Sequence, residues 1–340
     1  MSAAGEQGAN VRPAAVPVVS VVICTLDRAE LLKLALQSLS DQAAPWQSFE
    51  VIVVDNGSTD DTPAVARSFE GVLSLRYVRE ERTGLSHARN AGWAAARGAY
   101  VAYLDDDARA RPDWVQGILA AVAKEEPDVI GGPHLAAFQG GRPAWFPEDF
   151  ESWSPGDRDR ELRDNEYAKG MNFVVKRSVL ERLGGFRPDL GMAGASPGYG
   201  EETELQCRIH RLVPGAKLIY RPGVVVHHLV RPEKTALAWQ LRRCVRQGLQ
   251  AGAIYDRSAF GVRKCPRLHA LAAMLGHLAL AALEAAACPL RSRRAYPFWK
   301  AYALLKVCPH VYSVFAYASV LLGPSGGPGV RTSRGEVGDE

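Results

Sequence analysis

The sequence predicts an α/β fold in which a mainly parallel, mixed sheet is flanked by helices and followed by a C-terminal helical appendage. Two observations predict the sheet: short β-branched runs alternate with segments of helical spacing, and several of these runs end in polar side chains. A third predicts the appendage, because residues 236–320 are basic, aromatic and rich in alanine. The 340-residue chain is long enough for one large domain with an addition, or for two domains.

The first strand and helix follow directly from the apolar pattern. Residues 16–25 (VPVVSVVICT) have the continuous apolar character of a buried parallel strand. Residues 27–42 then place leucines at helical spacing. Asp27, followed three residues later by Glu30, resembles a capping box, so we expect Asp27 to cap this helix.

A second strand and helix repeat the pattern. Residues 49–55 (FEVIVVD) predict a strand that ends in the turn NGSTDDTP, where Thr62 is expected to cap a helix and Pro63 to take its first position. Helices of this length between strands favour right-handed crossovers and parallel pairing. The alternation continues with a strand near 74–78, a helix within 85–96, a strand at 99–104 and a helix after Pro112.

Polar residues gather where three predicted strands end. Thr25, Asp55 and the triplet Asp105, Asp106 and Asp107 all occupy carboxyl ends, which is where sheets of this kind bind ligands. Three adjacent carboxylates repel one another unless a cation or hydrogen-bond donors meet them. A solvated turn capping the next helix is one interpretation. The common edge favours the other, a divalent ion held by one or two carboxylates and substrate phosphates.

Composition limits where the protein is expected to act. Residues 1–17 are small and polar, which predicts a disordered start without a signal peptide. The six cysteines lack zinc-site spacing and are expected to be reduced thiols in a cytoplasmic protein. Residues 236–320 carry twelve Lys or Arg against two acidic residues, within a net charge of +4. Such a segment suits an anionic membrane surface, a phosphorylated partner or a solvated helix face. No nucleic-acid partner is expected.

Two loop regions allow alternative interpretations. Residues 137–168 mix aromatic residues with Gly, Pro and charges, so this segment is either a long connection or a flap over a substrate. GASPG at 194–198 matches the GxSxG pattern of a hydrolase, with Ser196 as nucleophile. The turn-rich sequence before it argues against the strand that this motif requires, and favours a loop that shapes an acceptor site.

Five blocks of the sequence together resemble a known family. The chain is similar to family 2 glycosyltransferases, which have the Rossmann-like GT-A fold, over about residues 18–235. The resemblance implies a nucleotide-binding half at 18–115 and an acceptor half at 116–235. The blocks are VSVVICTLDRAELL, VIVVDNGSTDDT, GLSHARNAGWAAARGAYVAYLDDD, NFVVKRSVLERLGGF and GYGEETELQCRI.

The resemblance implies inverting transfer of a sugar from a nucleoside-diphosphate sugar to an acceptor hydroxyl, assisted by Mn²⁺ or Mg²⁺. Thr25 and Asp55 would hold the base, and Asp55 favours UDP or dTDP because a carboxylate accepts a hydrogen bond from N3 of uracil or thymine. Asp105 would lie near the ribose and the metal, and Asp107 would bind the metal. The same nucleotide-sugar pocket is expected to include Asp27, Arg28, Arg89 and Asp106.

The family's catalytic base matches GYGEETELQCRI. Alignment selects Glu202, although the family more often has Asp there, which leaves Glu201 as the alternative. Carboxylates in a first helical turn are also favoured by the helix dipole without any catalytic role. Further on, His227 and His228 must point to opposite faces of a strand. The resemblance selects His228 as a metal or diphosphate ligand and Lys234 as its basic partner.

The appendage at 236–320 precedes a tail, 321–340, that is expected to be disordered. Residues 268–290 are long enough for a membrane span, but a polar stripe favours a helix packed on the domain or lying on a membrane. Aromatic residues interleaved with basic ones suit peripheral contact at the inner face of the cell membrane, and equally a homodimer contact. The alternative functions are a nucleotidyltransferase and a noncatalytic scaffold that binds nucleotide sugars.

Overall fold

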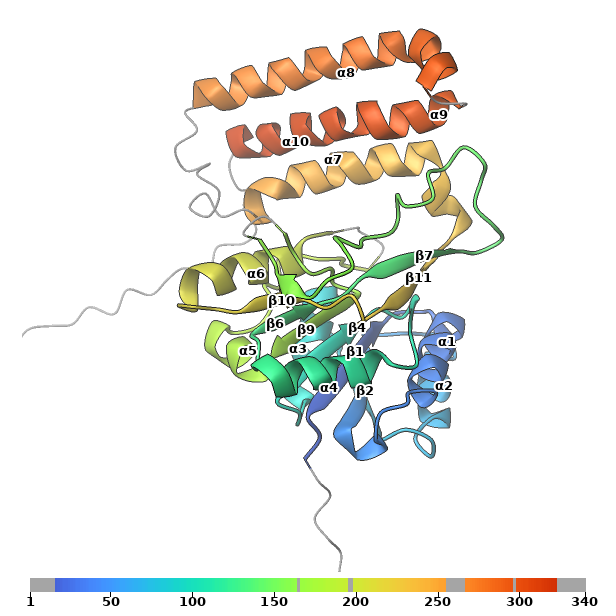
Figure 1. The fold of residues 1–340 in the computed structure, drawn as a ribbon, viewed down its shortest axis with the longest axis vertical. Helices are drawn as coiled ribbons and strands as arrows, with labels where there is room; N and C mark the ends of the chain where they lie inside the picture. Colours follow the sequence, from blue (N-terminus) through green and yellow to red (C-terminus); the bar gives the residue numbers. More distant parts are fainter. Residues whose placement is uncertain (1–15, 164–165, 195–197, 255–266, 296–297, 323–340) are drawn as a thin grey trace, which may run out of the picture.

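The computed structural model describes residues 16–163, 166–194, 198–254, 267–295 and 298–322. A sheet with helices on both faces forms the body, and a layer of long helices lies over it (Figure 1). The predicted disorder of 1–17 and 321–340 falls almost wholly outside the described residues. The predicted α/β fold with a C-terminal helical region is confirmed.

The large sheet has eight strands in the order β3-β2-β1-β4-β9-β6-β10-β8. Two of them, β9 and β8, run antiparallel to their neighbours, and the other pairings are parallel. The sheet is therefore mixed and mainly parallel, as predicted. Its strands are β1 (Val19–Thr25), β2 (Phe49–Asp55), β3 (Leu75–Arg79), β4 (Tyr100–Leu104), β6 (Val129–Gly131), β8 (Arg160–Glu161), β9 (Asn172–Lys176) and β10 (Leu218–Tyr220).

Helices pack on the two faces of this sheet and form two apolar cores. The first core joins β-strand side chains to three helices, α1 (Ala29–Ser40), α2 (Thr62–Ser68) and α4 (Trp114–Glu125). The second lies on the opposite face, under α3 (Leu85–Ala95), α5 (Arg177–Leu183) and α6 (Glu201–Leu212). Strands buried on both sides need the continuous apolar runs that the sequence shows.

A second, three-stranded sheet was not predicted. Its order is β5-β11-β7, with β5 at Ala108–Ala110, β11 at Val226–Val230 and β7 at His134–Phe138. His228 of β11 pairs with Ala108 in the register of this sheet. The chain directly after the acidic triplet is thereby held beside β11.

Both predicted helix caps are wrong. Asp27 does not cap α1, because it lies at φ 51° and its carboxylate instead accepts hydrogen bonds from the backbone N–H and the hydroxyl of Thr59. Thr62 is already the first residue of α2, its hydroxyl has no hydrogen-bond partner among the described residues, and its N–H donates to the carboxylate of Asp60. Asp60 thus takes the place of the predicted cap on α2, and the Asp27 side chain binds a neighbouring loop.

The helical layer has α7 (Leu237–Ile254) next to the body, α10 (Cys308–Leu322) beyond it and α8 (Arg267–Ala295) outermost (Figure 1). Short helical turns, α9 (Trp299–Tyr302) and a π-helical turn at Ala303–Val307, join α8 to α10. At Gly248 the two inner helices pack so closely that a Cβ would lie 2.6 Å from the backbone oxygen of Tyr312.

Part of the 137–168 segment is packed against this layer. Its aromatic residues Phe146 and Phe150 join an apolar cluster with Leu304 and Cys308. The segment therefore connects the body to the helical layer. Between β7 and β8 it also forms a backbone bridge from Trp153 to His134.

Candidate functional site

A cavity of about 960 Å³ opens at the carboxyl edge of the large sheet. A volume near the upper end of the range for ligand sites can hold a nucleotide sugar together with part of an acceptor. The acidic triplet and α6 contribute its acidic lining, and α7 and the 137–168 segment contribute much of the rest. Of the predicted site residues, those that line it are Thr25, Arg28, Arg89, Asp105, Asp106, Asp107, Glu201, Glu202, His228 and Lys234.

Two predicted base-binding or sugar-binding residues lie outside the cavity lining. Asp27 is exposed and ties its loop to Thr59. Asp55 is fully buried, and its carboxylate accepts hydrogen bonds from the backbone N–H of Ser58 and the hydroxyl of Tyr77. The structure thus shows structural contacts for both side chains, and their roles in donor binding stay predictions. Ser196 lies outside the described residues.

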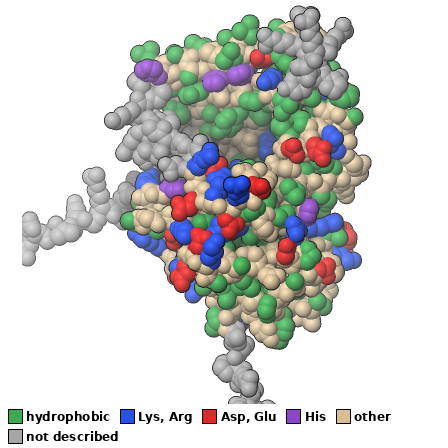
Figure 2. Space-filling model, in the orientation of Figure 1, with side chains coloured by type: hydrophobic (Ala, Val, Ile, Leu, Met, Phe, Trp, Pro, Cys, Tyr) green, Lys and Arg blue, Asp and Glu red, His purple; other side chains and the backbone are tan. Residues whose placement is uncertain are grey.

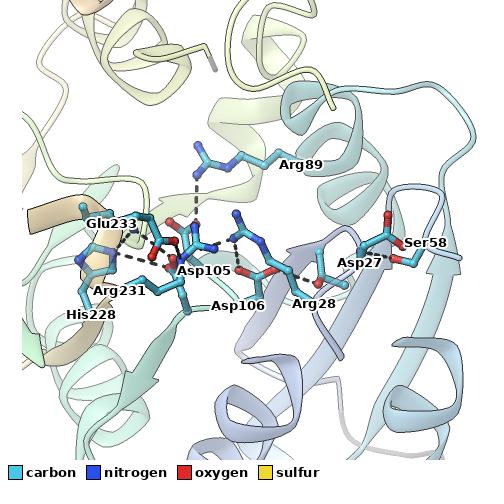
Figure 3. A network of polar contacts seen from close by, with 12 residues as sticks. Asp27, Arg28, Ser58, Arg89, Asp105, Asp106, His228, Arg231 and Glu233 are labelled. Carbon is cyan, nitrogen blue, oxygen red and sulfur yellow. Dashed lines mark hydrogen bonds and ion pairs between the residues drawn. The ribbon is translucent and has the colours of Figure 1, made fainter. Parts of the chain in front are cut away.

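The three carboxylates of the triplet have different partners. Asp106 accepts hydrogen bonds from Thr25 at 2.9 Å and from Arg28 at 2.8 Å (Figure 3). Burial raises the pKa of Asp106 to about 6, with Arg28 opposing the shift and the charge of Asp107 adding to it. Both oxygens of Asp106 are engaged, so this residue fixes the ends of β1 and β4 together.

Asp105 points toward a different part of the site. Its carboxylate lies 3.5 Å from the guanidinium of Arg89 (Figure 3). About a third of the side chain is exposed, whereas Asp106 and Asp107 are almost fully buried. Asp105 is therefore the member of the triplet that is most accessible from the cavity.

Asp107 meets the chain that follows β11. His228 Nε2 lies 3.7 Å from Asp107 Oδ1, and Lys234 Nζ lies 3.3 Å from Asp107 Oδ2. Burial acts to raise the pKa of Asp107, but nearby positive charge, led by the Lys234 ammonium and including Arg28, outweighs it and lowers the pKa. The prediction that only one of the two histidines reaches the site agrees with this geometry, since His227 is exposed.

The imidazole of His228 is neutral and therefore suited to bind a metal ion. Burial, reinforced by the charge of Lys234, lowers its pKa to about 4. Nε2 lies 3.0 Å from Lys234 Nζ, while Nδ1 is buried with no hydrogen-bond partner among the described residues. A neutral imidazole beside a carboxylate is a donor pair that suits a divalent ion.

Within the described part of the chain, no group of three or more His, Cys, Asp or Glu side chains converges as a metal site. Asp107 and His228 nevertheless lie close enough to bind one ion together, and both line the cavity, from which substrate and water would supply the other ligands. Mg²⁺ and related ions are commonly held by one or two protein groups, with substrate phosphates and water completing the shell. The donor set fits such an ion.

Gly200 positions the two candidate bases. Its φ of 85° lies in the left-handed region that glycine adopts at little cost, and α6 begins at the next residue. Glu201 and Glu202 therefore occupy the first turn of α6, where the helix dipole favours negative charge.

Arg89 distinguishes between these two glutamates. Its guanidinium donates a hydrogen bond to Glu201 Oε1 at 2.8 Å, and both side chains are nearly completely buried. Burial, with the charge of Glu202, raises the pKa of Glu201 to about 7 against the effect of Arg89. In contrast, the carboxylate of Glu202 makes no hydrogen bond or ion pair to any described residue and lines the cavity.

Arg89 is expected to be essential for stability. Replacing it by Met leaves Glu201 buried without a counter-charge, so we expect unfolding to become easier by about 3 kcal/mol or more. The matched change Arg177→Met removes an exposed pair with Glu181 and is expected to cost less than about 1 kcal/mol. Denaturant unfolding of both variants measures the difference. Equal losses would contradict a structural role for the Arg89 pair.

Several cavity residues were missed by the sequence analysis. Lys169 lies next to β9, and burial lowers its pKa. On α7, Trp239, Arg242, Arg243 and Arg246 line the same cavity. Their spacing of three, four and seven residues places them on one helix face, which is a signal that the sequence does contain.

The fold and the acidic cavity at its edge define a glycosyltransferase of the GT-A type. Residues 20–184 match the family described as Glycosyl transferase family 2. The matched part of the chain, residues 20–184, belongs to the family 2 glycosyltransferases, as the sequence blocks in it predicted.

Relatives in archaea and bacteria agree with this assignment. Glucosyl-dolichyl phosphate glucuronosyltransferase of Haloferax volcanii is 28% identical over 239 residues, which are 68% of this chain and 75% of that protein. Succinoglycan biosynthesis protein ExoM of Rhizobium meliloti is 28% identical over 273 residues, covering 78% of this chain and 84% of that protein.

A solved structure shares the fold over almost the whole chain. Mannosyltransferase PcManGT of Pyrobaculum calidifontis, in complex with GDP-Man and Mn²⁺, has a TM-score of 0.57 and 24% identity. The similarity covers 93% of this chain and 91% of that chain, so it includes the helical region as well as the sheet.

Proposed function

We propose that this protein is a metal-dependent, inverting glycosyltransferase that moves a sugar from a nucleoside-diphosphate sugar to an acceptor hydroxyl. One observation carries the proposal: Asp107, His228 and Lys234 meet in the same cavity that the unpaired carboxylate of Glu202 lines. Asp107, His228 and Lys234 are suited to bind a diphosphate and a cation, and the carboxylate of Glu202 is suited to accept a proton.

Asp107 and His228 would hold the divalent ion, with Asp105 at the accessible end of the triplet. When bound, Mn²⁺ or Mg²⁺ would offset the negative charge that develops on the departing diphosphate. The Mn²⁺ bound with GDP-Man in the mannosyltransferase of similar fold supports this choice of cofactor. Lys234 would pair with the diphosphate directly, because its ammonium already lies at the Asp107 carboxylate.

Glu202 would remove the proton from the acceptor hydroxyl as that oxygen attacks the anomeric carbon. The bond between that carbon and the diphosphate oxygen breaks, and the nucleoside diphosphate leaves with the electron pair. Glu201 is the less suitable base, although its pKa is raised to about 7, since Arg89 occupies one of its oxygens and the side chain is buried. Direct displacement of this kind inverts the anomeric centre.

The donor is proposed to be a UDP-sugar or dTDP-sugar. The support is the position of Asp55 at the end of β2, level with Thr25 in the sheet register. Base binding at Asp55 requires Tyr77 to give up its hydrogen bond to this carboxylate. Among solved structures of similar fold, one binds GDP-Man and another, TarS of S. aureus, binds UDP-GlcNAc.

We propose that three successive parts of the chain have different roles. Residues 18–115 would bind the nucleotide, residues 116–235 would supply the acceptor side, and the helical layer at 236–320 would place the enzyme at the cytoplasmic face of the cell membrane. Two stretches of this layer, Leu268–Pro289 and Trp299–Leu322, are long and apolar enough to cross a membrane by length and composition. We favour peripheral contact, since the sequence of this layer is rich in arginine and lysine.

Product analysis tests the proposed function. Incubation with UDP-sugars, dTDP-sugars and GDP-mannose in the presence of Mn²⁺ is expected to release a nucleoside diphosphate and to give a product of inverted anomeric configuration. Release of pyrophosphate from a nucleoside triphosphate would instead identify a nucleotidyltransferase. Nucleotide-sugar binding without release of either product would identify a scaffold.

A further inference from the structure

The two inner helices of the helical layer, α7 and α10, pack closely over several turns. A Cβ at Gly248 of α7 would lie 2.7 Å from the Cβ of Phe315 and 3.0 Å from the backbone nitrogen of Ala316. Earlier on each side, Leu241 and Leu304 pack in one apolar cluster. Because the earlier residue on one side meets the earlier residue on the other, the two stretches run in the same direction (Figure 1).

Each of these stretches carries a cysteine between the two contacts. Cys244 lies one turn before Gly248, and Cys308 lies one turn before Tyr312, whose backbone oxygen is the atom closest to a Cβ at Gly248. Both cysteines belong to the same apolar cluster, and their two thiols hydrogen-bond to each other. A disulfide requires α-carbons roughly 4.4–6.8 Å apart. Facing residues one turn from a backbone contact are placed to form one.

The two thiols differ in access and in acidity. Cys308 is only 2% exposed, whereas Cys244 is half-buried. The hydrogen bond with Cys308 lowers the pKa of the Cys244 thiol, and the charge of Arg243 adds to this against the effect of burial. The same hydrogen bond raises the pKa of Cys308. An accessible thiol that favours the thiolate, beside a buried protonated thiol, is the arrangement of a reactive cysteine with a resolving cysteine.

The charged side chains of the protein gather away from this pair of thiols. Green side chains lie along the helical layer in Figure 2, while charged ones gather over the body beneath it. Carboxylates near a thiol disfavour the thiolate, which is the form that reacts. Cys24 at the end of β1 shows this effect: burial raises its pKa to about 12, and the charge of Asp105 adds to the shift against Arg89. Cys24 therefore provides an unreactive thiol in the same chain for comparison.

We propose that Cys244 and Cys308 are a site of reversible oxidation, at which hydrogen peroxide forms a disulfide that joins α7 to α10. The free thiols seen in the structure are the reduced form of this site. The inference does not depend on the proposed function. Its consequence reaches the cavity, because Trp239 of α7 and Tyr312 of α10 both line it. The disulfide fixes these two parts of the cavity wall relative to each other.

The oxidation removes two electrons from the thiols and consumes one molecule of peroxide. The thiolate of Cys244 attacks one peroxide oxygen, so that an S–O bond forms, the O–O bond breaks and hydroxide leaves with the thiol proton as water. Cys308 then attacks the sulfur of this sulfenic acid. The S–S bond forms, the S–O bond breaks, and the second hydroxide leaves as water with the proton of Cys308. A dithiol such as dithiothreitol reverses the reaction by thiol–disulfide exchange.

Thiol trapping and mass spectrometry test the inference. The full chain is treated with hydrogen peroxide, its remaining thiols are alkylated after denaturation, and the protein is digested. We expect a crosslinked pair of peptides that contains Cys244 and Cys308, is two hydrogens lighter than the separate thiol peptides, and disappears with dithiothreitol. Cys244 is expected to be oxidised roughly tenfold or more faster than Cys24, because the thiolate is the reacting form.

Three serine variants separate the roles of the thiols. Cys244→Ser is expected to abolish the crosslink. Cys308→Ser leaves Cys244 without a resolving thiol, so oxidation is expected to stop at the sulfenic acid, which dimedone labels. The matched control Cys288→Ser removes another thiol of the helical layer, one that donates to the backbone oxygen of Trp299, and is expected to keep the crosslink. Loss of the crosslink in this control as well would contradict a specific pair.

Two results would overturn the inference. One is a folded chain that keeps both thiols at peroxide concentrations that oxidise free cysteine. The other is a bridge from Cys244 to a different cysteine or to a second chain, which migrates as a dimer in electrophoresis without reductant. Neither result bears on the proposed sugar transfer, since the trapping requires no substrate.

Discussion

Replacing Glu202 by Gln is expected to lower turnover by roughly 10² to 10⁴-fold, the range found for loss of a general base. The amide has nearly the same shape as the carboxylate but does not accept the proton of the attacking hydroxyl. The carboxylate of Glu202 has no hydrogen-bond or ion-pair partner among the described residues, and Gln206 donates only to the backbone oxygen of Glu202, so the change breaks no side-chain contact of this kind. Donor binding, measured by calorimetry, and unfolding are therefore expected to stay close to those of the unchanged protein.

Two further variants make this result specific. Glu181→Gln alters an exposed carboxylate on α5 that pairs with Arg177, and it is expected to leave turnover unchanged. Glu201→Gln removes the counter-charge of Arg89 and is expected to act mainly through stability. A folded Glu201→Gln protein that loses more turnover than Glu202→Gln would transfer the role of base to Glu201.

Replacing Asp107 by Asn is expected to remove the effect of Mn²⁺ on nucleotide binding. The amide is a poorer ligand for a divalent ion, and it leaves the ammonium of Lys234 without its carboxylate. In the unchanged protein we expect one nucleoside diphosphate to bind much more tightly with Mn²⁺ than without it. In the variant this advantage is expected to fall on the order of 10²-fold, measured by calorimetry with UDP, dTDP, GDP and CMP.

The control for Asp107 is Asp189→Asn, which alters an exposed carboxylate that pairs with Arg187. This variant is expected to retain the full response to Mn²⁺. If Asp107→Asn also retained it, the proposed metal position at Asp107 and His228 would be wrong. Circular dichroism of each protein shows whether a lost response reflects a lost fold.

Much of the sheet could be predicted because the information is local. The strands β1 and β2 are runs of seven residues that are almost wholly buried, and their apolar character is visible without any partner. The small sheet could not be predicted in this way. Its β5 has three residues, too few for a pattern, and it forms only because β11 pairs with it from far along the chain.

The same difference between local patterns and contacts across the chain applies to the candidate site. The sequence placed Asp107, His228 and Glu202 in one pocket through motifs, and the structure brings them to one cavity. The sequence did not show that Arg89 engages Glu201, which lies 112 residues away. Nor did it show that the Asp27 side chain binds a neighbouring loop, since that contact depends on how β1 and β2 are placed.

The orientation of α8 shows a different limit. Its polar and apolar stripes can be read from the sequence, but the pattern does not say which stripe faces the protein. Both positions expected for this helix, packed on the domain or lying on a membrane, left that side open. The contact between His277 and His310 decides the matter, and it depends on α10, which follows later in the chain.

The reversed strand β9 has a consequence for how such an enzyme can change. Because β9 runs antiparallel to β4, its first residue, Asn172, lies beside Leu104 at the end of β4. The segment that enters β9 therefore delivers Lys169 and Gly170 to the mouth of the pocket from the opposite direction. The segment after β4 and the segment before β9 therefore reach the same edge of the sheet from opposite directions. Residues in either segment can change to suit another donor sugar or another acceptor while the other segment keeps its position.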